Sequence, residues 1–141
     1  MDALELVKEY YIRLDTGRPD LLDIFSEDAQ FYFPKFGVSR GKSTFGDLLN
    51  GLLSAVAMIK HDLDGLDFIV EGNRVAVEGT TSGRLHDGRE WEGGKTPGGR
   101  FSSVFEIKDG LISRMHVYLD PDYGGVDTDR FLWPASEERH W

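Results

Sequence analysis

One aspartate and one histidine, far apart in the chain, could together form an acid/base pair. Asp15 closes the first amphipathic segment, and His61 opens a later segment with the alternation of a strand. An imidazole titrates near neutral pH, so a carboxylate beside it can prepare it for proton transfer. We expect His61 to move the proton and Asp15 to orient the ring. A solvated turn aspartate and a structural histidine are the alternatives.

Tyr10 is a third candidate for chemistry because it lies on the apolar stripe of the same first segment. Its ring should face the sheet, where a buried phenol usually finds a hydrogen-bond partner. That partner is either a main-chain carbonyl in the core or a negative charge that develops on a substrate oxygen. We expect the second role, in which Tyr10 steadies an oxyanion.

Other kinds of chemistry have little support in the sequence. The chain has no cysteine, which excludes thiol nucleophiles, disulfides and cysteine-based metal sites. The four histidines (61, 86, 116 and 140) show no metal-ligand spacing, so we expect neither a metal nor another cofactor. The glycine-rich residues 93–99 lack the pattern of a phosphate-binding loop. They indicate a hairpin tip or a lid, beside which Trp91 could stack on a ligand.

The elements that must position these residues are helices first and strands afterwards. Apolar spacing of three and four residues predicts helices over 2–15, 21–25 and 44–57. Alternation and turn signals predict strands over 29–33, 58–70, 74–85, 89–105 with an interruption at 93–99, and 111–119. This order indicates an α+β fold. We expect a cone-like roll, in which a strongly curved antiparallel sheet holds three helices on its concave side.

Such a cone encloses a natural pocket for a small molecule. We expect a mostly apolar wall with a few polar groups, formed by Phe31, Phe33, Phe101, Phe105, Met115 and Val117 with Thr81 and Ser103. Along the last strand, only one of two alternating sets can face the helices. Burial favours Met115 and Val117 inside. Arg114, His116 and Tyr118 should then lie on the convex face, where we expect them to contact the second subunit of a homodimer.

Composition indicates one soluble domain. The chain has 141 residues, 40% of them hydrophobic, and a formal net charge of −9. An acidic surface repels phosphate groups, so binding to nucleic acid or to anionic membranes is disfavoured. The start of the chain lacks an export signal, and no apolar stretch is long enough to span a bilayer. We expect a cytoplasmic protein with one domain over 1–121. An acidic, aromatic tail over 122–141 should pack on this domain or on the partner subunit, which Phe131 and Trp133 could cover.

Several short sequences in this order resemble the nuclear transport factor two-like superfamily, and within it the SnoaL-like branch. They run from Tyr10 to Gly17, Phe25 to Ala29, Arg40 to Lys42, Asn73 to Val77, Asp109 to Ile112 and His116 to Pro121. The resemblance covers about residues 3–121 and implies a cone fold and a homodimer packed through the convex sheet faces. The superfamily includes cyclases, dehydratases, isomerases, epoxide hydrolases and non-catalytic binding proteins, so the fold alone does not fix a reaction.

Individual enzymes of the superfamily match this chain in part. Tyr10 is placed like the oxyanion tyrosine of ketosteroid isomerases, but Phe33 stands where their general base would be. Asp15 and His61 are placed like an aspartate and a histidine of scytalone dehydratase, but Leu14 stands where that enzyme has a tyrosine. The resemblance therefore supports the acid/base pair without selecting one reaction.

These observations lead to one functional hypothesis and two alternatives. The hypothesis is a cofactor-independent acid/base enzyme of cyclase, dehydratase or isomerase type that acts on a mainly apolar carbonyl or polyketide-like substrate. The first alternative is a non-catalytic module that binds a small apolar ligand. The second is a dimeric partner domain without a ligand.

Overall fold

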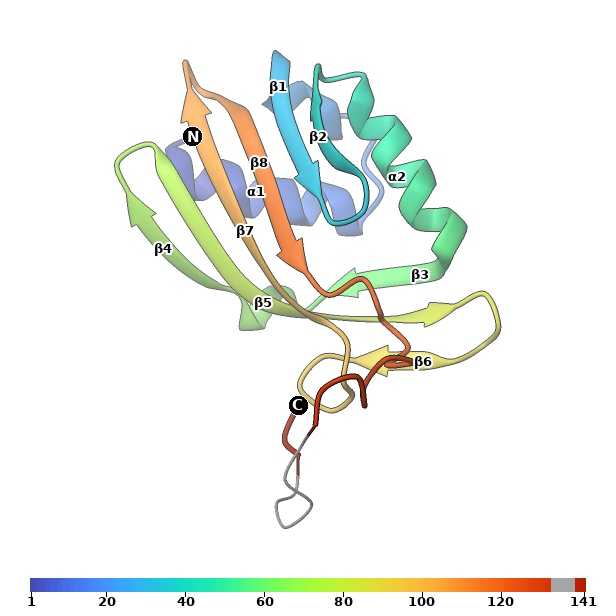
Figure 1. Cartoon of the computed structure of the whole chain (residues 1–141). Coiled ribbons are helices and arrows are strands. Elements are labelled where there is room, and N and C mark those ends of the chain that lie inside the picture. The colour runs from blue at the N-terminus through green and yellow to red at the C-terminus, as the bar shows by residue number, and fades with distance from the viewer. Residues whose placement is uncertain (133–138) are drawn as a thin grey trace.

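The computed structural model describes residues 1–132 and 139–141 (Figure 1). Its helices and strands are α1 (Ala3–Asp15), β1 (Phe25–Phe33), β2 (Gly37–Arg40), α2 (Thr44–Ala55), β3 (Val56–His61), β4 (Asp67–Glu71), β5 (Arg74–Leu85), β6 (Glu90–Glu92), β7 (Arg100–Lys108) and β8 (Leu111–Leu119). Both α-helices contribute to one core with the concave side of the curved sheet (Figure 1). The structure therefore confirms the predicted α+β fold with a curved sheet.

The sheet is mixed, and the prediction of a purely antiparallel sheet is wrong. β1 pairs with β8 in parallel, with Phe31 opposite Met115. The other strand pairs of the described residues are antiparallel. Parallel neighbours need a long connection between them, and here residues 34–110 provide it. Local turn signals report only consecutive hairpins, so they could not reveal this pairing.

Two α-helices, not three, lie within the described residues. The apolar stretch predicted as the second helix forms a single 3-10 turn, Leu21–Ile24. Phe25 is already extended and begins β1, so the strand starts earlier than predicted. The register between β1 and β8 shifts between Phe25 and Gln30. This irregularity accommodates Ser26, Glu27 and Asp28, polar residues of β1 whose sequence is typical of a turn.

The predicted strand over 58–70 is two strands separated by a second 3-10 turn, Leu63–Gly65. β3 pairs with the C-terminal half of β5, and β4 pairs with its N-terminal half. On the opposite edge, β7 and β6 divide β5 in the same way. The turn residues Asp62 and Asp64 are the signal for this break, but the alternation on either side of them hid it.

The buried residues form two separate groups. The main core joins α1, α2 and the sheet, and its largest fully buried side chains are Tyr11, Phe25, Phe31, Phe45 and Phe105. A smaller group consists of Val56, Trp91 and Tyr123, the last of which follows β8. Side chains from both groups line one cavity.

Candidate functional site

A cavity of about 340 Å³ lies between the two α-helices and the concave face of the sheet. Its volume is within the range of ligand pockets, roughly 300–1,000 Å³. Apolar side chains make most of its wall, among them Leu48 and Leu52 of α2 and Leu119 of β8. Leu53 and Met58 line it and are themselves 50% and 46% exposed, so they mark its mouth.

Asp15 and His61 meet at the wall of this cavity. The Oδ1 atom of Asp15 lies 2.7 Å from Nδ1 of His61, and its Oδ2 atom accepts a hydrogen bond of 2.8 Å from the main-chain N–H of His61. The two side chains are 5% and 13% exposed, respectively. Because Nδ1 faces a carboxylate, a neutral His61 carries its proton there and leaves Nε2 as the basic nitrogen. No described residue forms a hydrogen bond with Nε2.

The position of Asp15 follows from how α1 ends. The Thr16 hydroxyl donates to the Ile12 carbonyl at 2.6 Å, and Gly17 takes a left-handed φ of 63° that turns the chain away from the helix axis. Asp15 is the last residue of α1, so its carboxylate emerges at the end of the helix that faces the end of β3.

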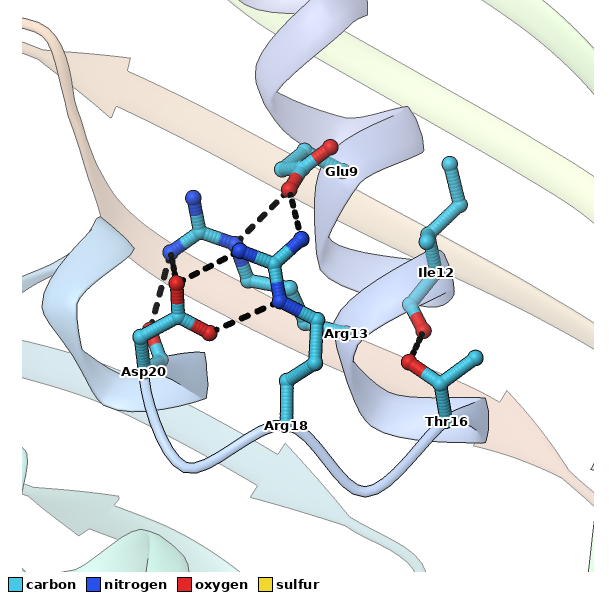
Figure 2. A network of polar contacts seen from close by, with 6 residues as sticks. All are labelled: Glu9, Ile12, Arg13, Thr16, Arg18 and Asp20. Atoms are coloured by element: carbon cyan, nitrogen blue, oxygen red, sulfur yellow. Dashed lines mark hydrogen bonds and ion pairs between the residues drawn. The ribbon is translucent and has the colours of Figure 1, made fainter.

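A polar network fixes this end of α1 to the turn that follows (Figure 2). Arg13 donates to the Glu9 carboxylate at 2.9 Å and to the main-chain carbonyl of Asp20 at 2.8 Å. Arg18 donates to the side-chain carboxylates of Glu9 and Asp20. The hydrogen bond from Arg13 is the main cause of a lowered pKa of Glu9, and the one from Arg18 has the same effect on the pKa of Asp20. These carboxylates are therefore ionised at neutral pH and hold the two arginines in place.

Tyr11 is the phenol that contacts the histidine of the pair, and the sequence analysis missed it. Its ring centroid lies 5.0 Å from that of His61. Burial raises the pKa of Tyr11, a hydrogen-bonding contact with the Ser103 side chain offsets part of the rise, and the charge of Asp15 adds to it. That contact falls outside good hydrogen-bond geometry, so the Tyr11 hydroxyl has no well-formed hydrogen bond with a described residue. The available signal was spacing, because Tyr11 precedes Asp15 by one helical turn and shares its face.

Tyr10, the predicted oxyanion donor, also lines the cavity. Its ring packs edge-on against its neighbour on α1 and against Phe25, Phe45 and Phe105. Burial raises the pKa of Tyr10 well above its usual value, so the phenol stays protonated. Its role towards an oxyanion stays a prediction.

Most of the predicted ligand-binding residues line the cavity, namely Phe33, Thr81, Phe101, Ser103, Met115 and Val117. Trp91 does not. It is 2% exposed and donates from Nε1 to the Thr81 hydroxyl at 3.1 Å, so it supports the wall from behind. Phe31 and Phe105 are fully buried in the main core and do not line the cavity either. Alternation places these side chains on the correct face of the sheet, but it does not say which of them the helices cover.

The outward residues of β8 alternate with the inward ones as predicted. Met115 and Val117 line the cavity, whereas Tyr118 is 48% exposed. His116 is 7% exposed, with Nε2 at 2.9 Å from the Gln30 amide nitrogen and Nδ1 at 3.1 Å from the Arg114 guanidinium. Burial and the charge of Arg114 lower the pKa of His116. The expected contact of this face with a second subunit stays a prediction.

The chain that leaves β8 folds against β6 and the glycine-rich residues 93–99 (Figure 1). Tyr123 stacks on Trp91 with ring centroids 4.6 Å apart and lines the cavity. A Cβ atom at Gly98 would lie 2.5 Å from the Tyr123 carbonyl oxygen, so this glycine permits the close approach. Residues 93–99 are thus a packing surface for the chain end. Phe131 is 80% exposed, and Trp133 lies outside the described residues.

His86 does not line the cavity, but its Nε2 atom is 2.8 Å from the main-chain carbonyl oxygen of Leu53 at the cavity mouth. In the part of the chain that the structure describes, no group of three or more histidine or acidic side chains could hold a metal ion. The described helices also include none with the length and apolar character needed to cross a bilayer.

A family model of the SnoaL-like domain matches residues 7–115. The chain belongs to the SnoaL-like domain family. The matched region includes both members of the acid/base pair and ends within β8, so the chain that follows β8 lies beyond it. A search of curated proteins gave no match.

Solved structures of similar fold include candidate polyketide cyclases. One from Xanthomonas campestris pv. campestris has a TM-score of 0.72 and 20% identity, covering 84% of this chain and 90% of that chain. Another, from Pseudomonas putida KT2440, has a TM-score of 0.68 and 25% identity over 87% and 95% of the two chains. TerC, co-crystallised with polyporic acid, has a TM-score of 0.72 and 18% identity over 84% and 91%. These similarities support the SnoaL-like fold.

Proposed function

We propose that this SnoaL-like protein is a cofactor-independent acid/base enzyme of cyclase, dehydratase or isomerase type. Its substrate would be a mainly apolar molecule with a carbonyl group. The observation that carries the proposal is the 2.7 Å contact between Asp15 Oδ1 and His61 Nδ1 at the wall of an apolar cavity. A buried carboxylate that orients an imidazole in this way is a common arrangement for proton transfer.

The proposed step is proton abstraction from a carbon next to the substrate carbonyl. His61 Nε2 takes the proton and becomes part of an imidazolium, which Asp15 stabilises through Nδ1. The electron pair of the broken C–H bond moves into an enolate, whose oxygen accepts a hydrogen bond from a phenol. Tyr11 supports this role because its ring contacts His61 and its hydroxyl has no partner among the described residues. Tyr10 is the second candidate donor.

Two findings on related proteins support a carbonyl-bearing substrate. Structures of similar fold include candidate polyketide cyclases, and another protein of similar fold, TerC, was co-crystallised with polyporic acid. The wall of the cavity adds the second constraint, since its polar groups are few and the rest is apolar. A substrate with an apolar body and a reactive carbonyl matches both.

The proposal can be tested with 2-acetylnaphthalene, an apolar ketone with exchangeable methyl protons beside its carbonyl. In D₂O, the protein should accelerate exchange of these protons for deuterium above the rate in buffer, as followed by NMR. His61→Gln should reduce the protein-dependent rate by about 100-fold, which is typical for loss of a general base. Asp15→Asn should reduce it less, because the base is retained but loses its orientation.

A matched control is His140→Gln, since His140 is exposed and does not line the cavity. This variant should exchange deuterium like the wild type. If the ketone binds and no exchange above buffer occurs, the acid/base proposal is wrong and a non-catalytic binding module is supported instead. If the ketone and related probes neither bind nor raise the melting temperature, the partner-domain alternative is supported.

A further inference from the structure

We propose that Tyr123 is a ligand-binding residue which, together with Tyr11, selects ligands with an apolar body and a hydrogen-bond acceptor at each end. The inference rests on the proposed function in one respect, the binding of a small molecule in the cavity. It does not require that His61 transfers a proton.

Tyr123 comes from outside the matched SnoaL-like region and yet lines the same cavity as the acid/base pair. It is 4% exposed and lies in the smaller buried group with Val56 and Trp91. Tyr11 belongs instead to the main core, beside His61. The two phenols therefore line the same cavity from different buried groups.

The hydroxyls of these two phenols share a second property. Among the described residues, they are the two buried side-chain polar atoms without a hydrogen-bond partner. Buried polar groups are nearly always paired, and an unpaired one is a source of instability. A ligand with an acceptor oxygen at each end would pair both hydroxyls at once. A ligand without such oxygens would leave both unpaired in a dry site.

Both phenols are donors under physiological conditions. Burial raises the pKa of Tyr123 to about 12, and burial likewise raises that of Tyr11. Each hydroxyl thus keeps its proton and presents it to an acceptor such as a carbonyl or a phenolate.

The chain around Tyr123 is held in one arrangement. The Asp122 carboxylate accepts hydrogen bonds from the main-chain N–H groups of Val126 and Asp127, at 3.0 and 2.8 Å. On the other side, Gly98 permits close approach of the Tyr123 main chain. A residue fixed in this way can discriminate between ligands, because the protein would have to give up these contacts to move it.

Three naphthalene probes test the inference by calorimetric or fluorescence titration. They are 2,6-diacetylnaphthalene with two acceptors, 2-acetylnaphthalene with one, and 2-isopropenylnaphthalene, in which a methylene group replaces the carbonyl oxygen. Tyr123→Phe and Tyr11→Phe each remove one hydroxyl. We expect each variant to weaken binding of the two-acceptor probe by about five- to tenfold, as for loss of one hydrogen bond. The one-acceptor probe should respond to one variant only, and the hydrocarbon probe to neither.

Tyr32→Phe serves as the matched control, since Tyr32 lies on the convex face with the rings of His116 and Tyr118. Infrared spectra of the bound two-acceptor probe give a second readout. Its carbonyl stretch should lie at lower frequency in the wild type than in Tyr123→Phe.

The outcomes separate the two proposals. Equal binding of the two-acceptor probe to the wild type and Tyr123→Phe, or an equal loss for the hydrocarbon, overturns the role of Tyr123 and leaves the acid/base proposal intact. Loss of deuterium exchange with retained probe selectivity overturns the enzyme proposal alone. No binding of any probe to the wild type contradicts both.

Discussion

At the residue scale, Asp15 performs two tasks with its two oxygens. One oxygen orients the imidazole of His61 and the other accepts from the main chain of the same residue. This double contact fixes the end of β3 as well as the ring. The carboxylate is thus structural and functional at once, and substitutions there must be evaluated for both effects.

Asp15→Asn should change the protonation pattern of His61. In the wild type, the neutral ring should carry its proton on Nδ1, because the carboxylate accepts from it. The amide of the variant can donate as well as accept, so this tautomer loses its preference. The measurement is ¹⁵N NMR of the imidazole nitrogens, which distinguishes the tautomers. We also expect a loss of about 1–3 kcal/mol in the free energy of unfolding, since a buried charged hydrogen bond is removed.

The same ¹⁵N tautomer pattern in Asp15→Asn and the wild type would contradict this assignment. Ser113→Ala gives a comparison for stability alone. It removes a hydroxyl that donates to the Glu106 carbonyl and does not line the cavity, and the imidazole signals should remain as in the wild type.

His116 should make the protein less stable in mild acid. The folded state lowers its pKa below the usual 6.5 through burial and the charge of Arg114. As the pH falls below 6.5, the unfolded chain therefore binds the proton before the folded one does, and stability decreases until the folded His116 also titrates. Urea unfolding from pH 7.5 to 5 measures this slope. His116→Asn should flatten it, and an unchanged slope would contradict the prediction.

At the element scale, the end of α1 determines where the acid of the site lies. The helix begins with a capping box between Asp2 and Glu5 and ends at the arginine and carboxylate network of Figure 2. A helix fixed at both ends delivers Asp15 to β3 with little freedom. Local sequence thus determines a contact between distant segments.

Arg13→Gln should loosen this end of the helix. Arg13 is 13% exposed and reaches both Glu9 and the Asp20 carbonyl, whereas Arg18 is 41% exposed. We expect the melting temperature of Arg13→Gln to fall by several degrees at pH 7, and that of Arg18→Gln to fall less. The low folded pKa values of Glu9 and Asp20 mean that their contribution is present above the usual values of 4.5 and 3.8 and lost at lower pH. The difference between the wild type and Arg13→Gln should therefore shrink in acid, as differential scanning calorimetry can measure. A difference that persists there would show that packing of the arginine dominates.

At the scale of the whole molecule, the outer face of the sheet is expected to form a homodimer. Arg114, His116 and Tyr118 are the expected contact residues, and Gln30 and Tyr32 of β1 lie beside them. A polar and aromatic surface of this kind is typical of interfaces between subunits. The prediction is independent of the cavity, which opens on the other side of the sheet.

Tyr118→Glu should separate the predicted dimer, because it places two new charges at the contact. Sedimentation equilibrium should give the mass of a dimer for the wild type and of a monomer for the variant. Ser54→Glu is a suitable control, because it adds a charge at an exposed position of α2, away from the outer face of the sheet. A wild-type protein that sediments as a monomer at micromolar concentration would contradict the predicted assembly.

The sequence predicted most helices and strands correctly, but it did not predict how the strands pair in the sheet. The capped first helix, the inward set of β8 and the approach of Asp15 to His61 follow from periodicity, turn residues and the resemblance to the family. The parallel pairing of β1 with β8 has no local signal, because it joins distant parts of the chain. Tyr11 was missed because Tyr10 matched the apolar stripe, and Tyr123 because nothing in the sequence ties the chain end to the cavity.

The parallel contact between β1 and β8 has a consequence for how the chain acquires its structure. Gln30 of β1 and His116 of β8 are 86 positions apart. β1 can therefore pair with β8 only after residues 111–119 have been synthesised. During synthesis, β1 can pair with β2 but not yet with β8, so one edge of β1 and its aromatic residues stay accessible to chaperones or to other nascent chains. Contacts over such separations slow folding. Folding should accordingly be a late, all-or-none event, and fragments that stop before β8 should remain unfolded.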